Sequence, residues 1–180
     1  DIQDIADLAS ITDDFHTIDV EGVITSLSGG TLKLLNLLQN DRRIWEEVCF
    51  LPLDEDQPSS PAFLAILIAA MKKTKRLSID CILSDTTAYS CLATGLLAHD
   101  GIQELVLNRS GNLGVDAAKV LAEAMACTTC RLKRLELECG NSLPENVCDV
   151  FVEALKRNRS LKTLELAFGT SPVHKFMCNL

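Results

Sequence analysis

The sequence predicts an α/β protein in which parallel strands form one sheet and a row of helices covers one of its faces. Three observations lead to this prediction. A frame of three apolar residues recurs along the chain: an anchor, followed by apolar residues three and five places later. The anchors are separated by 28 to 30 residues throughout. A helical pattern of about ten to fifteen residues stands between successive frames. Self-similarity of this period is typical of stacked supersecondary units.

Each frame has the alternation of a strand of about five residues. We expect its fourth and sixth places to face the core and its third, fifth and seventh places to face away. The last three frames carry an aliphatic residue at every apolar place. The third frame is less pure because its anchor is Thr74, and the first two begin with aromatic residues and are assigned from their spacing. A second interpretation of Trp45 is that it closes a small N-terminal helical unit. The anchors are Phe15, Trp45, Thr74, Ile102, Leu132 and Leu161.

Helices are expected between the frames, each after a polar or Gly- or Pro-containing turn. Pro144 stands in such a turn, where a first helical turn tolerates proline. Residues 2–9 have the same helical pattern with no strand before them, and residues 168–180 begin a further unit that is not completed. We therefore expect the chain to be a segment of a longer protein. The predicted helices cover residues 31–38, 62–71, 88–98, 117–125 and 147–155.

A strand followed by a helix and then by a parallel strand places the sheet on one side and the helices on the other. Because a helix with its packing is wider than the spacing of about 4.8 Å between strands, the stack is expected to bend. The strands then line the concave face and the helices the convex face. We predict a right-handed α/β solenoid, a single domain of about six repeats over residues 1–180.

The overall composition limits the function. The chain has 180 residues and a formal net charge of −8, which argues against nucleic acid or an anionic membrane surface as the ligand. The longest apolar run, residues 62–71, is too short for a membrane helix. The eight cysteines fall largely within predicted strands and helices of a chain too long to depend on disulfides. We expect a cytoplasmic protein with reduced thiols.

With this frame and period, the sequence resembles the leucine-rich repeats of the ribonuclease-inhibitor class. The LxxLxL frame and the corner-plus-strand segment 154–166 carry the resemblance, which covers the chain and is strongest over residues 102–166. Where the class has an Asn after the strand, this sequence has Ile82, Ser110, Gly140 and Gly169. The resemblance implies the solenoid fold. It implies no single function, because similar repeats occur in ribonuclease inhibitors, innate immune receptors, the GTPase-activating protein for Ran and tropomodulin-like actin regulators.

The same place in neighbouring strands of equal repeats lies side by side, so each place forms a column across the sheet. In column three the charges alternate in sign. Its members can therefore pair across strands, or simply form a solvated ladder that contributes little to stability. Column three consists of Thr17, Glu47, Arg76, Glu104, Arg134 and Thr163.

Columns five and seven contain carboxylates but no base. Such a field can steer a basic protein segment to the sheet, with Leu51, Val106 and Phe168 as exposed apolar anchors. The alternative is that these are ordinary surface positions of an acidic protein. Column five consists of Asp19, Cys49, Ser78, Val106, Glu136 and Glu165, and column seven of Glu21, Leu51, Asp80, Asn108, Glu138 and Ala167.

Motifs for catalysis or metal binding are weak. Cys127-Thr-Thr-Cys130 has the spacing of half a zinc site or of a redox pair, but a matching second half is missing. His16, His99 and His174 fall in different repeats, away from any recognisable nucleophile. The sequence therefore predicts neither an enzyme nor a metal, cofactor or small-molecule site.

The leading hypothesis is a module that binds a protein partner with a basic surface on its acidic concave face. A second hypothesis, implied by the resemblance, is a GTPase-activating function with Arg76, Asn108 and Arg109 as candidate rim residues. A third is a structural segment of a larger receptor. The candidate partner-binding residues are Asp19, Glu21, Glu47, Arg76, Asp80, Glu104, Asn108, Arg134, Glu136, Glu138 and Glu165.

Overall fold

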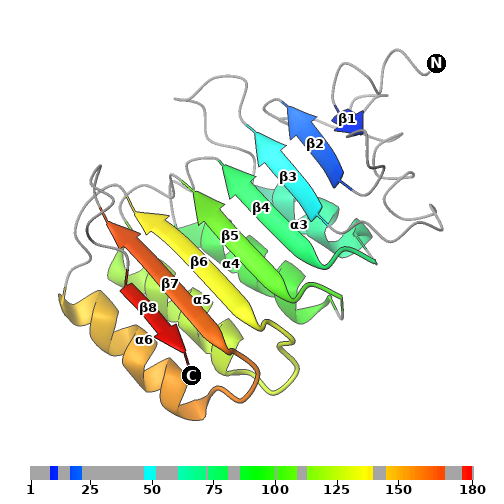
Figure 1. Ribbon diagram of the computed structural model, residues 1–180. Coiled ribbons are helices and arrows are strands. Elements are labelled where there is room, and N and C mark those ends of the chain that lie inside the picture. The colour runs from blue at the N-terminus through cyan, green and yellow to red at the C-terminus, as the bar shows by residue number, and fades with distance from the viewer. Residues whose placement is uncertain are drawn as a thin grey trace.

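Strands and helices alternate along most of the described chain (Figure 1). The computed structural model describes residues 9–11, 17–21, 47–51, 61–71, 73–80, 86–99, 101–108, 113–139, 145–168 and 176–179. The strands are β1 (Ala9–Ile11), β2 (Thr17–Glu21), β3 (Glu47–Leu51), β4 (Arg76–Asp80), β5 (Glu104–Asn108), β6 (Arg134–Cys139), β7 (Thr163–Phe168) and β8 (Phe176–Asn179). The helices are α3 (Pro61–Ala70), α4 (Thr86–Leu97), α5 (Val115–Ala126) and α6 (Glu145–Arg157).

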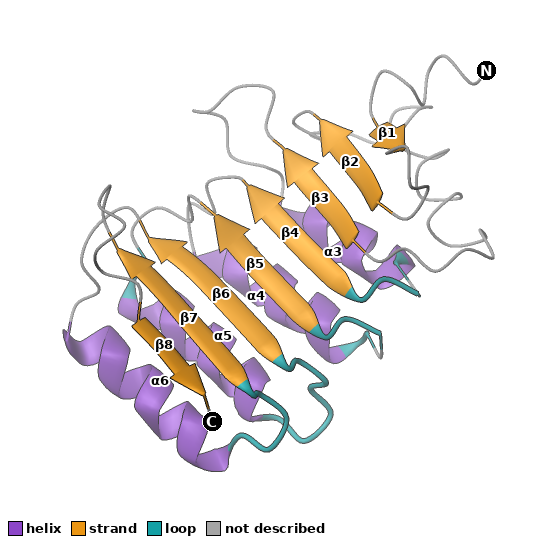
Figure 2. Ribbon diagram, in the orientation of Figure 1, coloured by secondary structure: helices purple, strands orange, loops and turns teal. Residues whose placement is uncertain are grey.

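Within these residues the strands form one sheet in sequence order, from β1 to β8. The strands from β2 to β7 are all parallel to their neighbours. The helices cover one face of the sheet, and the other face carries no described helix (Figure 2). The predicted α/β architecture, with parallel strands and helices on one side, is therefore confirmed for this part of the chain.

The predicted register of the strands is also confirmed. Val20 lies opposite Phe50, and Phe50 lies opposite Ile79, so the first two frames join the same set of aligned strands as the later ones. Strand β3 begins two places after Trp45 and pairs on both sides; Trp45 itself, and with it the second interpretation of this frame, lies outside the described residues. Column three runs from Thr17 to Thr163 in the order predicted.

The core lies between the sheet and the helices. The fourth and sixth frame places are buried in strand after strand, as Leu105 and Leu107 illustrate with no exposed surface. Tyr89 of α4 and Phe151 of α6 pack into the same core from the helix layer. Burying a leucine side chain such as that of Leu105 stabilises the fold by about 1.5–3 kcal/mol. The period-two apolar pattern therefore decides which face of each strand meets the helices.

The strands of successive repeats begin in the same way. One backbone carbonyl at the start of each strand accepts two N–H groups from the next repeat, at 2.7 and 3.0 Å. Because this pattern recurs with the same distances, the parallel strands enter the sheet at equivalent points. The three carbonyls are those of Lys75, Gln103 and Lys133.

Both ends of the sheet differ from the prediction. Ala9, predicted as the last residue of a helix, begins β1, which pairs antiparallel with β2. Residues 168–180 were expected to begin a further unit that is not completed, but β8 returns antiparallel to β7. A short returning strand pairs with the outer parallel strand at each end, and its length of three or four residues leaves little edge for further pairing. The predicted helix at residues 31–38 lies outside the described residues.

The described helices match four of the predicted ranges to within about two residues at each end, which is the usual uncertainty of a helix boundary. Within the described residues, every helix falls short of the length and apolar character that crossing a membrane requires.

Candidate functional site

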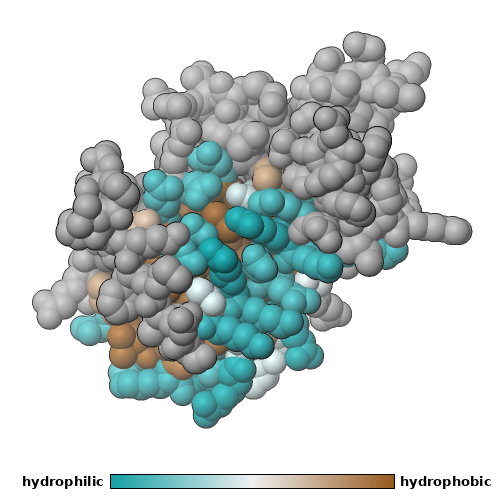
Figure 3. Space-filling view, in the orientation of Figure 1, coloured by the Kyte–Doolittle hydropathy of each residue, from teal (hydrophilic) through white to brown (hydrophobic). Residues whose placement is uncertain are grey.

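The predicted site residues lie on the sheet face that points away from the helices. We use the term column face for columns three, five and seven of strands β2 to β7. Hydrophilic residues gather over the middle of this face (Figure 3). From β3 to β7 it carries six carboxylates against two guanidinium groups. Asp19 and Glu21 belong to it through the register of β2, but their side chains lie outside the described residues.

Column three contains one cross-strand ion pair of the predicted kind. Nε of Arg76 lies 3.1 Å from Oε1 of Glu47, and the two side chains are 39% and 27% exposed. A partly solvated pair of this kind contributes at most about 1 kcal/mol to stability. Its effect is to hold both side chains in place on the column face.

Arg134 makes the second set of ion pairs and corrects the sequence analysis. Its Nη2 lies 2.7 Å from Oε1 of Glu165 and 3.2 Å from Oε2 of Glu136. Two column-five carboxylates thus share a cation from column three. The prediction treated each column separately and is wrong here, because residues two apart on a strand share one face and an arginine side chain is long enough to reach diagonally. We refer to these three residues as the Arg134 cluster.

Two side chains expected to be exposed are buried. Glu165 is 3% exposed and Val106 is also 3% exposed, so the prediction that each is offered to solvent is wrong. Val106 lies in the middle of the sheet, between Ser78 and Glu136 in column five. Glu165 is covered while bound to Arg134. The side chains of Leu51 and Phe168 lie outside the described residues.

The remaining predicted residues are accessible to a partner. Glu138 is exposed, and the others are half-buried. Asp80 and Asn108 lie side by side in column seven of β4 and β5. From β3 to β7 the column face therefore offers polar groups, with a carboxylate excess that persists after the Arg134 cluster is counted. The half-buried residues are Glu47, Arg76, Asp80, Glu104, Asn108, Arg134 and Glu136.

The rim residues proposed for a GTPase-activating function are only partly described. Arg76 is bound to Glu47 and Asn108 ends β5, while Arg109 lies outside the described residues. That function stays a prediction, which a GTP hydrolysis assay with and without this chain tests.

Within the described residues, no group of three or more His, Cys, Asp or Glu side chains is placed to hold a metal ion. His99 is buried in the corner between α4 and β5, where its ring binds backbone groups. His16 and His174 lie outside the described residues.

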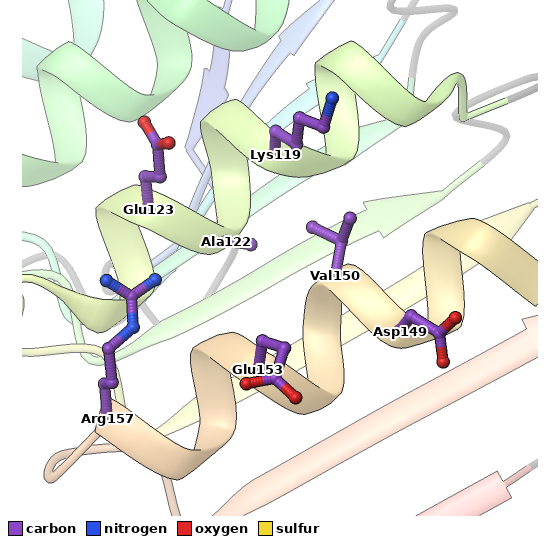
Figure 4. A pocket seen from close by; sticks show the side chains of 7 residues that line it. All are labelled: Lys119, Ala122, Glu123, Asp149, Val150, Glu153 and Arg157. Carbon is purple, nitrogen blue, oxygen red and sulfur yellow. The ribbon is translucent and has the colours of Figure 1, made fainter.

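A groove between α5 and α6 was missed by the sequence analysis (Figure 4). Its volume is about 270 Å³, and Ala122 and Val150 contribute apolar surface. The signal in the sequence is the four-residue spacing of charges on two successive helices, which places them on one helix side. The charged residues that line it are Lys119 and Glu123 of α5 and Asp149, Glu153 and Arg157 of α6. These residues carry both signs, so the groove has no strong preference for an ion of one charge.

Comparison with known proteins leaves the family open. No protein-family model matches the sequence, and a search of curated proteins finds no match. The strand register places the charged residues of β3 to β7 on one surface, the column face.

Proposed function

We propose that this chain is a leucine-rich-repeat module of the ribonuclease-inhibitor class that binds a basic segment of a partner protein on its column face. The alignment of the columns is the observation that carries the proposal. Equal register in β3 to β7 brings six carboxylates and two guanidinium groups from five strands onto one surface. Carboxylates spread through the sequence thereby act together on one ligand.

The carboxylate excess supports a basic ligand. Exposed carboxylates such as Glu138 attract Lys and Arg side chains and speed their encounter with the sheet. The ion pairs of Arg76 and Arg134 hold neighbouring side chains in one arrangement, so less conformational entropy is lost on binding. The column face thus combines attraction with pre-organisation.

The size of the surface sets the length of the ligand. Four steps between neighbouring strands lead from β3 to β7, which at about 4.8 Å a step is about 19 Å. An extended chain advances about 3.3 Å per residue, so about six residues cross the column face. We therefore expect a short extended segment in which Lys or Arg recurs.

A panel of labelled peptides of this length tests the proposal. Basic, neutral and acidic peptides of the same length are titrated with the chain, and the dissociation constants are measured by fluorescence anisotropy at low and at physiological ionic strength. We expect affinity to rise with the number of Lys and Arg residues and to fall with added salt. Binding that is equal for neutral and basic peptides, or absent for all, would contradict the proposal.

A further inference from the structure

The turn between α5 and β6 holds two thiols close together. Cys127 caps the C-terminus of α5, where its N–H donates to the carbonyl of Ala124 at 3.2 Å. The N–H of Cys130 then donates to the carbonyl of Cys127 at 3.1 Å. A turn closed by this hydrogen bond keeps its end Cα atoms within about 7 Å, which is the range that a disulfide spans. Both cysteines are free thiols in the structure.

Cys127 is the reactive thiol of the two. It is partly exposed, and its Sγ lies 3.1 Å from the Oγ1 of Thr129. Hydrogen bonds from the Thr129 side chain and N–H, with a further one from the N–H of Thr128, lower the pKa of Cys127. The carbonyl groups at the end of α5 oppose a negative charge there. The thiolate form of Cys127 therefore depends on Thr129.

Cys130 has the opposite environment. It is 4% exposed and belongs to the core, and burial raises the pKa of its thiol. The backbone N–H of Leu132 is hydrogen-bonded to this thiol. At the equivalent place in two other corners, the anchor N–H of Ile102 binds a histidine nitrogen and that of Leu161 an asparagine oxygen. In this corner a sulfur replaces those acceptors, so the anchor contact itself is oxidisable.

We propose that Cys127 and Cys130 form an oxidation site that reduces a hydroperoxide and becomes a disulfide. The Cys127 thiolate attacks the terminal peroxide oxygen, the O–O bond breaks, and the departing oxygen takes a proton to leave as an alcohol or as water. Cys127 is then a sulfenic acid. The Cys130 sulfur attacks Sγ of Cys127, the S–O bond breaks, and the hydroxyl leaves as water with the Cys130 proton. Two thiols lose two electrons and two protons, and the peroxide gains them.

Exposure alone predicts a different order of reaction. Cys148 on α6 is exposed, whereas Cys127 is only partly so. If access decided reactivity, Cys148 would react first. If the hydrogen bonds of Thr129 decide it, Cys127 reacts first. The two cysteines thus form an internal comparison within one protein.

Limited oxidation of the full chain with hydrogen peroxide, followed by alkylation and tryptic mass spectrometry, tests the site. Cleavage after Lys119 and Arg131 releases residues 120–131, which contain both cysteines, while Cys148 lies in another peptide. We expect the 120–131 peptide to lose two hydrogen atoms and to resist alkylation while Cys148 remains alkylated. In a Cys130→Ala variant we expect dimedone to trap the Cys127 sulfenic acid.

The Thr129→Val variant, which changes an exposed side chain, tests the mechanism. We expect its Cys127 to be alkylated at least about threefold more slowly at neutral pH, with the rate rising at a higher pH than in the unmodified chain. Oxidation of Cys148 before Cys127, or an unchanged rate in Thr129→Val, would overturn the proposal. Oxidation of the two sulfurs separately, with no disulfide between them, would also overturn it.

Discussion

His99 and Asn158 hold two corners of the fold through the same set of hydrogen bonds. The Nδ1 of His99 accepts the backbone N–H groups of Gly101 at 2.9 Å and of Ile102 at 3.0 Å. Its Nε2 bonds to the carbonyl of Met71, at the end of α3. These partners require a neutral ring with the proton on Nε2. The imidazole thus joins the end of α3 to the segment that leads into β5.

Asn158 performs the same task after α6. Its Oδ1 accepts the N–H groups of Ser160 at 3.0 Å and of Leu161 at 2.7 Å. Its Nδ2 donates to the carbonyl of Met125 at 2.6 Å, at the end of α5. A carboxamide and a neutral imidazole both offer one acceptor and one donor on opposite sides. His99 and Asn158 therefore play the same part in their two corners, although the carbonyl that each binds lies at a different distance along the chain, 28 residues before His99 and 33 before Asn158.

The first prediction concerns His99. His99→Asn keeps an acceptor for two N–H groups and a donor for the carbonyl of Met71, so we expect a change in the free energy of unfolding of less than about 1 kcal/mol. His99→Leu removes the acceptor of the Gly101 and Ile102 N–H groups and the donor to the carbonyl of Met71, which still accepts the N–H of Thr74 at 3.3 Å, and should destabilise by about 2–4 kcal/mol. Urea unfolding followed by circular dichroism measures both. Equal losses in the two variants would contradict the equivalence.

The second prediction couples Gly101 to His99. A Cβ at Gly101 would lie 2.8 Å from Cε1 of His99 and 3.1 Å from the carbonyl oxygen of Thr74. Gly101→Ala should therefore destabilise the chain by about 1–3 kcal/mol. Removing the ring removes the closer contact. In the His99→Asn background the same change should cost about 1 kcal/mol less, and a double-mutant cycle with no coupling would be evidence against this packing.

The third prediction concerns the contact between α3 and α4. Replacing a helical glycine by alanine commonly stabilises a protein by about 1 kcal/mol. At Gly95, however, a Cβ would lie 2.8 Å from Cγ2 of the buried Ile68. We expect Gly95→Ala to destabilise by about 1–3 kcal/mol, measured as a shift of the urea midpoint.

Gly114 provides the matched control for Gly95. It caps the N-terminus of α5, and a Cβ there would meet nothing within 4 Å. Gly114→Ser supplies a capping hydroxyl and should leave stability unchanged or raise it by a few tenths of a kcal/mol. Destabilisation at Gly114 equal to that at Gly95 would mean that glycine is needed for a reason other than helix packing.

The fourth prediction separates the two arginines of the column face. Arg134→Leu removes the cation that lies 2.7 Å from the carboxylate of Glu165, which is 3% exposed, and should destabilise by about 2–3 kcal/mol. Arg76→Leu breaks a pair whose members are 39% and 27% exposed, and should cost less than about 1 kcal/mol. The comparison uses the same substitution in the same column. Similar losses in the two variants would contradict the greater cost that we assign to removing a cation from the buried carboxylate of Glu165.

Much of the fold could be predicted because one signal repeats. Leu105 and Leu107 stand two apart, as core-facing strand residues do, and the same spacing recurs at a constant interval. The interval fixes which residues lie side by side, so Glu47, Arg76 and Glu104 could be assigned to one column by counting residues, and the strand pairing confirms the assignment. Register followed from counting because the repeats have nearly equal lengths.

The antiparallel direction of β8 could have been predicted from the short connection that precedes it. Seven residues separate Phe168 at the end of β7 from Phe176 at the start of β8. A parallel strand needs a crossover of about a dozen residues or more. A connection as short as this one therefore favours an antiparallel strand. Residues 168–180 were assigned to a further unit from the repeat period alone, without regard to the length of the connection between β7 and β8.

Side-chain contacts could not be predicted from the columns. Arg134 contacts Glu136 and Glu165 because its long side chain crosses from one column to the next. The capping role of His99 depends on a ring reaching the carbonyl of Met71 in the preceding repeat. Both contacts depend on where a side chain points within a repeat, and spacing alone does not determine that direction.

The central claim is that the column face binds a basic protein segment, and charge reversal on each face of the molecule tests it most directly. One double variant, Glu104→Lys with Glu138→Lys, changes the column face. Its control, Glu123→Lys with Asp149→Lys, makes the same charge change at the groove between α5 and α6. The measurement is the dissociation constant of the tightest-binding basic peptide from the panel.

We expect the column-face variant to bind this peptide at least about tenfold more weakly and with a weaker salt dependence. The control should bind within about threefold of the unmodified chain, because its changed residues lie on the helices and the added charge acts only through screened, long-range repulsion. Equal weakening in both variants, or none in the column-face variant, would contradict the claim.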